Sequence, residues 1–169
     1  MKFIDSHRDA WHTVVGEDGP MPHPNPGPNR LLTLEQWHAV REHWPAEVKA
    51  GVIVPNDADI ETLEACLPRL GLVVLQFPKW VDGRAYSQAR ILRRRYRFAG
   101  EVRATGDVVV DMLPLLQRTG FDAVVLRGDQ KLDIAQRLLA SFPAPFPAHY
   151  QGDVLQHQPL FARSGAEQA

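Results

Sequence analysis

The sequence predicts a single α/β domain with a small, mainly parallel β-sheet, arranged as a half-barrel or as an open sheet. Four short apolar segments each lead into a segment with helical periodicity, and glycines separate these units at spacings of roughly 20–30 residues. Strands that alternate with helices form βαβ units, which build parallel sheets. The chain has 169 residues. A complete eight-unit barrel typically needs about 250 residues, so only part of one is expected.

The first 30 residues are expected to form a strand or hairpin and then an exposed loop. Residues 1–15 mix apolar and polar side chains, which favours a short hairpin or an edge strand. Residues 16–29, GEDGPMPHPNPGPN, hold too many prolines for a helix or for the inside of a sheet. Thr33 and Gln36 have the spacing of a capping box, so a helix should begin there and stop before Pro45.

The βα core is expected over residues 50–140, and residues 141–169 are expected to form a C-terminal arm. Apolar runs predict strands at 50–57, 72–77, 101–106 and 122–127. Polar residues after each strand can begin the next helix, and glycines can end the units. The expected starts are Asp57 or Asp59, Asp82 or Gly83, Asp107, and Asp129, and the expected stops are Gly71, Gly100 and Gly120.

Composition and motif absences exclude several classes of protein. The net charge of −1 gives no general reason to expect nucleic acid or an acidic membrane as partner. No apolar run is long enough to span a membrane, and the first residues lack the apolar centre of a signal peptide. A cytoplasmic location is therefore expected. The single cysteine, Cys66, is expected in the core. We find no dinucleotide, P-loop, CxxC or metal-ligand motif, and expect no cofactor and no metal.

The carboxyl ends of the predicted strands carry most of the residues suited to chemistry. Ligands of parallel α/β sheets bind at this edge, because loops and helix N-termini converge there. Lys79, Arg84 and Arg127 beside helix amides suit a small oxyanion, such as a sulfur oxyanion, phosphate or carboxylate. Asp82 lies among these cations, and Tyr86 and Ser87 follow on the first turn of the next helix.

Purely structural roles explain several of the same residues. Capping alone explains Asp107 and Asp129. It also explains Asp82, but Asp82 forms a cation–carboxylate cluster with the flanking Lys79 and Arg84 that capping does not require. Arg103 lies inside a strand, and if that strand is covered on both faces it needs a carboxylate partner, such as Asp107 or Asp122. Arg93, Arg94 and Arg95 are expected to form a solvated helix face, with docking of an acidic protein as the alternative.

Three segments of the chain form one long and specific pattern: FPKWVDGRAYSQARILRRRY, GEVRATGDVVVDML and RTGFDAVVL. Together they resemble a bacterial family known as domain of unknown function 934. The resemblance extends more loosely over most of the chain. It implies an association with sulfite reduction, because such proteins are commonly labelled probable oxidoreductases of sulfite reduction. It also places a set of motif residues together: Lys79, Asp82, Arg84, Tyr86, Ser87, Arg103, Asp107 and Asp111.

Three hypotheses follow. The leading one is an accessory protein of assimilatory sulfite reduction that acts with the sulfite reductase haemoprotein. The alternative is a small enzyme acting on an anionic small molecule. It would use Lys79, Asp82 and Tyr86 in catalysis, and would bind the anion with Arg84, Ser87, Arg103, Asp107, Asp111 and Arg127. The third is a homodimer that exchanges its proline-rich segments and C-terminal arm.

Overall fold

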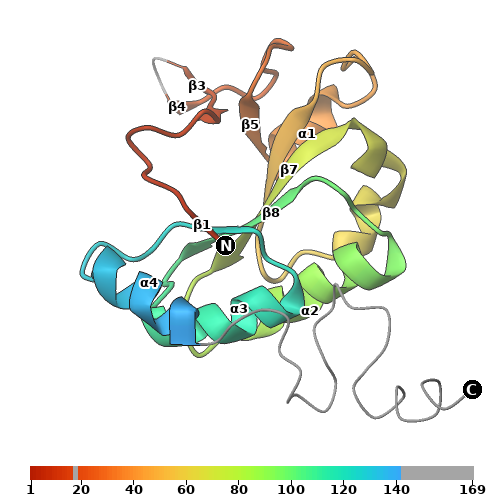
Figure 1. Ribbon diagram of the computed structural model, residues 1–169. Helices are drawn as coiled ribbons and strands as arrows, with labels where there is room; N and C mark the ends of the chain where they lie inside the picture. The colour runs from red at the N-terminus through yellow and green to blue at the C-terminus, as the bar shows by residue number, and fades with distance from the viewer. Residues whose placement is uncertain (17–18, 142–169) are drawn as a thin grey trace, which may run out of the picture.

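The computed structural model describes residues 1–16 and 19–141 and shows a curled, half-barrel-like sheet with helices packed against it (Figure 1). Seven strands form this sheet in the order β1-β9-β8-β7-β6-β5-β2, and every neighbouring pair is parallel. The predicted α/β fold with a parallel half-barrel is therefore confirmed. The expected arm at 141–169 lies outside the described residues apart from Ser141, the last residue of a helix.

Five strands follow one another in the chain and are also neighbours in the sheet: β5 (Arg30–Thr33), β6 (Ala50–Val54), β7 (Leu70–Phe77), β8 (Glu101–Gly106) and β9 (Ala123–Val124). Helical segments connect them: α1 (Leu34–Val40), the 3₁₀ helix η1 (Ile60–Arg69), α2 (Arg84–Arg90) with its π-helical extension η2 (Ile91–Arg95), and the 3₁₀ turn η3 (Val110–Met112) leading into α3 (Leu113–Thr119). The helix α4 (Leu132–Ser141) follows β9.

The two faces of the sheet have different partners. The register aligns Leu32, Val52, Val73 and Val102 in one row, and Val54, Leu75, Ala104 and Val124 in the next. All eight belong to the main core, which also holds the buried residues of the helices. The opposite, inner face carries a second cluster of Leu31, Leu72 and Val74, against which Trp11 packs. Strands buried on both faces read as continuous apolar runs, which is why β6 and β7 stand out in the sequence.

The N-terminal segment lies along both edges of the sheet and across its inner face (Figure 1). β1 (Lys2–Phe3) pairs with β9, and β2 (His12–Thr13) pairs with β5 at the opposite edge. An edge strand was expected here. The antiparallel pair of β3 (Val15–Gly16) and β4 (Gly19–Pro20) begins at the last residue of the expected hairpin region and lies mostly in the segment predicted to be a loop.

Helix starts were predicted in part. Thr33 forms the expected capping box with Gln36, and Asp59 caps η1. Asp107 is no helix cap, because the following helical turn begins with Val109 as its N-cap. The backbone N–H of Asp107 instead donates to the carbonyl of Phe77 at 2.7 Å. The preceding residue, Gly106, has a φ of 97°, a conformation that favours glycine. Gly120 ends α3 in the left-handed conformation, as expected for a stop.

No helix within the described part of the chain is long and apolar enough to cross a membrane.

Candidate functional site

A charge cluster around Arg127 joins the loops that follow β7, β8 and β9. The guanidinium of Arg127 donates to Asp129 at 2.6 and 2.7 Å and to Asp107 at 2.6 Å. The other oxygen of Asp107 accepts the backbone N–H of Trp80 at 2.9 Å. Arg127 holds the pKa of both aspartates below their ordinary range, and Asp129 and Asp107 raise the pKa of Arg127. All three groups are therefore charged at neutral pH.

A second ion pair lies where the β7–α2 loop meets the start of α2. The Arg84 guanidinium donates to both oxygens of Asp82, at 3.0 Å from Nε and 2.8 Å from Nη2. This two-pronged contact is the geometry that Arg makes best with a carboxylate. The bond to Arg84 lowers the pKa of Asp82. The buried Asn56 amide, from the loop after β6, lies close enough to lower it further, although outside hydrogen-bonding geometry.

Between these loops lies a cavity of about 560 Å³, lined in part by Trp80, Tyr86, Asp111, Leu115, Arg127 and Gln130. Trp80 is 57% exposed at its rim. Gln130 is held in place, because its Oε1 accepts the backbone N–H of Val110 at 3.0 Å. Three of the predicted site residues thus line one cavity: Tyr86, Asp111 and Arg127.

Tyr86 is the half-buried member of this group. Its ring packs edge-on against Phe77, with centroids 5.1 Å apart, and against Phe121 at 6.3 Å. Burial raises the pKa of Tyr86 to about 12. At neutral pH the phenol keeps its proton, so Tyr86 can donate a hydrogen bond or a proton but cannot accept one as a general base.

The remaining predicted residues of this edge are solvent-exposed. Lys79 lies in the β7–α2 loop and Ser87 on α2, and both are exposed, as is Asp111 on η3. None of these three side chains forms a hydrogen bond or ion pair with another of the described residues. Asp111 lies four residues after Asp107, but the two carboxylates share no partner in the described chain.

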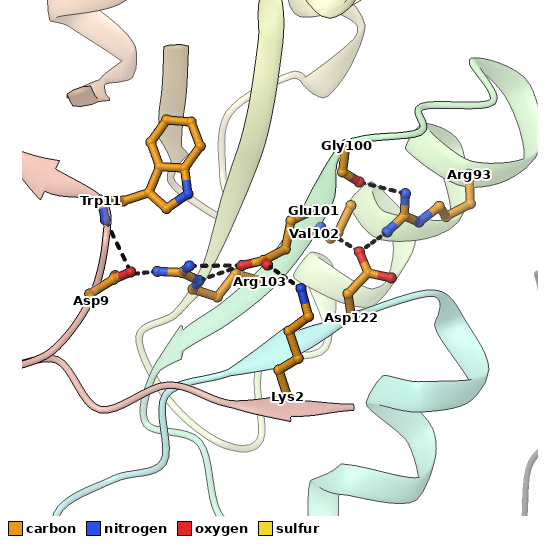
Figure 2. Close-up of polar contacts among 9 residues, drawn as sticks. All are labelled: Lys2, Asp9, Trp11, Arg93, Gly100, Glu101, Val102, Arg103 and Asp122. Atoms are coloured by element: carbon orange, nitrogen blue, oxygen red, sulfur yellow. Dashed lines mark hydrogen bonds and ion pairs between the residues drawn. The ribbon is translucent and has the colours of Figure 1, made fainter. Parts of the chain in front are cut away.

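The structure does not bring Arg103 to this edge. Figure 2 shows its side chain on the inner face of the sheet, between Asp9 of the N-terminal segment and Glu101 of its own strand. Arg103 is 3% exposed. The need for a carboxylate partner was predicted, but the expected partners, Asp107 and Asp122, were wrong. Asp107 binds Arg127, and Asp122 lies on the other side of the β8 backbone.

Arg93 corrects the interpretation of the arginine run as a solvated face. Its side chain is 6% exposed and donates to Asp122 and to the carbonyl of Gly100 (Figure 2). It also donates to the carbonyls of Phe98 and Gly120. Asp122 in turn accepts the N–H of Val102 at 2.9 Å. This arginine therefore ties η2 to the starts of β8 and β9. Arg94 and Arg95 are exposed as predicted, and Arg95 pairs with Glu61.

Sequence reasoning gave no role at this site to Trp80 and Gln130. Trp80 lies directly after the carboxyl end of a strand, and this position was a usable signal. No signal of that kind points to Gln130.

Within residues 1–16 and 19–141 there is no group of three or more His, Cys, Asp or Glu side chains that could hold a metal ion.

Comparison with known proteins places the chain in a family. No curated protein matches it. A family model described as a bacterial protein of unknown function matches residues 51–161, from β6 past the end of α4. This region contains the cavity, the Arg127 cluster and the Asp82–Arg84 pair. Because the match covers more than half of the chain, this protein belongs to the DUF934 family.

Proposed function

We propose that this protein is an accessory protein of assimilatory sulfite reduction and acts with the sulfite reductase haemoprotein. The observation that carries an accessory, protein-binding role is the exposed apolar tip of the β7–α2 loop. Trp80 and Val81 are 57% and 65% exposed there. Large apolar side chains held on a surface mark protein–protein contact sites, and Trp is enriched among the residues that dominate binding energy.

The loop that presents this tip is well supported. The backbone N–H of Asp82 donates to the carbonyl of Lys79 at 2.9 Å and closes a turn around Trp80 and Val81. Asp107 accepts the N–H of Trp80, and Arg127 holds Asp107 in turn. A side chain presented on a preorganised loop loses little conformational freedom when a partner binds.

The charges at this edge favour a protein partner over a small anion. Of the three cations expected to bind an anion, Arg84 and Arg127 already have carboxylate partners, and only Lys79 has none in the described chain. An incoming anion would have to compete with those carboxylates for both guanidinium groups. The link to sulfite reduction itself rests on the resemblance of residues 77–96, 100–113 and 118–126 to proteins labelled with that process.

Growth of a deletion strain on single sulfur sources tests the proposal. We expect the strain to grow on sulfide and cysteine but not on sulfate or sulfite. A plasmid copy with Trp80→Ala and Val81→Ser should fail to restore growth on sulfite, because the binding tip is lost while the fold remains. The control is Val15→Ser, which removes a side chain that is 62% exposed on β3. Normal growth of the deletion strain on sulfate would refute the link to sulfite reduction.

A further inference from the structure

We propose that the cavity beside Trp80 receives a basic side chain, Arg or Lys, of the protein partner. This inference rests on the proposed protein-binding role and specifies the chemistry of what binds. The cavity of about 560 Å³ opens between the β7–α2 loop, η3 with the start of α3, and the residues after β9. Its size falls within the range of cavities that bind small ligands, and a long side chain can enter it.

The charges around the cavity favour a cation. Arg127 is the one cation in its lining, and two carboxylates, Asp107 and Asp129, already bind it. Asp111 adds a third carboxylate, exposed in the lining and without an ion-pair partner in the described chain. Asp107 and Asp129 compensate the charge of Arg127, so Asp111 is the lining carboxylate that remains available to a cation. Such a site attracts basic groups and repels acidic ones.

The aromatic residues favour the same ligand. Trp80 and Tyr86 both line the cavity, and Trp80 is largely exposed. The face of an indole attracts ammonium and guanidinium groups, and Arg stacks on such rings particularly well. Leu115 and Met112 provide apolar contact for the methylene stem that Arg and Lys carry behind the charge. A carboxylate, an aromatic face and an apolar wall together match the three parts of a basic side chain.

Binding of short peptides to the purified full-length protein tests this inference. The probes are blocked tripeptides Ac-Gly-X-Gly-NH₂ in which X is Arg, Lys, citrulline or Glu. Chemical shifts of the Trp80 indole N–H and the Asp111 amide report binding, because both residues line the cavity. We expect saturable shifts with Arg and Lys, weaker ones with citrulline, which is isosteric with Arg but neutral, and none with Glu.

Two variants and a matched control locate the site. Asp111→Asn should weaken binding of the Arg peptide about two- to fivefold, the range expected for a solvent-exposed ion pair. Trp80→Ala should weaken it by a similar factor through loss of the cation–π contact. Glu47→Gln removes one negative charge from an exposed position before β6, outside the cavity, and should leave binding unchanged.

The outcomes separate this inference from the sulfur phenotype. Equal shifts with the Arg and Glu peptides, no shift with any peptide, or an equal effect of Asp111→Asn and Glu47→Gln would overturn it. None of these results depends on growth of the deletion strain. If the peptides bind as expected while the deletion strain grows normally on sulfate, the cavity stands and the partner is a protein outside sulfite reduction.

Discussion

At the scale of single residues, burial separates arginines with structural roles from those at the candidate site. Arg93 and Arg103 have 6% and 3% exposed side chains, and each is surrounded by acceptors from several segments. Arg84 and Arg127 have 56% and 42% exposed side chains, and their pairs lie in water. A buried charge must be paired to be tolerated, whereas an exposed pair contributes little to stability.

Arg103 should therefore be among the most sensitive positions for folding. Arg103→Met leaves Asp9 and Glu101 facing an apolar side chain. We expect the free energy of unfolding to fall by about 3 kcal/mol, as is typical when one partner of a buried pair is removed. Urea denaturation followed by circular dichroism measures it. The matched control, Arg84→Met, should lose much less, and an equal loss in both variants would mean that the buried pair of Arg103 is no more important for folding than the exposed pair of Arg84.

The double variant Asp9→Asn, Arg103→Met supplies an internal check. Because Asp9 acts through Arg103, the combined loss of stability should be smaller than the sum of the two single losses. Strict additivity would mean that the ion pair across the inner face contributes nothing to the fold.

Tyr86 gives a prediction about pH. Its folded-state pKa of about 12 lies above the ordinary value of 10.0. Folding thus favours the neutral phenol. The stability from this preference is fully present below pH 10 and is lost as the pH rises from about 10 towards 12. Absorbance at 295 nm should show a phenolate component near pH 12, and Tyr86→Phe should remove it. A Tyr86→Phe protein that keeps that component would contradict the assignment.

At the scale of elements, the sequence predicted what is coded within one segment. The sequence marks β6, β7 and β8 by apolar runs or by flanking glycines. The predicted bounds of these strands agree with the observed ones to within a few residues. The capping box at Thr33 and the stop at Gly120 depend on neighbouring residues only, and both are present. Local signals of this kind can be read directly from the chain.

Elements that depend on distant partners were missed or shortened. β5 has only Leu31 and Leu32 as apolar residues, and β1 and β2 have two residues each, so none carries an alternation pattern. They are strands because the neighbouring strand supplies their hydrogen bonds. β9 is shorter than predicted because Arg127 donates its N–H to the carbonyl of Val108, in the loop after β8, instead of extending the ladder.

At the candidate site, too, signals within one segment were predictive, whereas contacts between distant segments were not. The principle that ligands bind at the carboxyl ends of parallel strands placed Tyr86, Asp107 and Arg127 in one region, where the structure has them, and the family resemblance added Asp111. It could not say which carboxylate each arginine binds. The partner of Arg103, Asp9, lies 94 residues away in the chain, and no local pattern reports that distance.

At the scale of the whole molecule, the N-terminal segment completes a fold whose family-matched region begins only at residue 51. It supplies the strands at both edges of the sheet and carries Asp9 and Trp11 onto the inner face. Trp11 lies so close to Gly51 that a Cβ added there would come within 2.9 Å of the ring. The inner face is thus shaped to receive this segment.

Removal of residues 1–11 should accordingly destabilise the entire protein. The shortened chain loses β1, uncovers the apolar cluster on the inner face and leaves Arg103 with Glu101 alone. We expect the melting temperature to fall by about 10 °C, the shift that about 3–5 kcal/mol produces in a domain of this size. Thermal denaturation by circular dichroism measures the shift, and a synthetic peptide of residues 1–13, added in excess, should reverse much of it by mass action. If the shortened chain melts at the same temperature as the full-length protein, the N-terminal segment does not contribute to the stability of the fold.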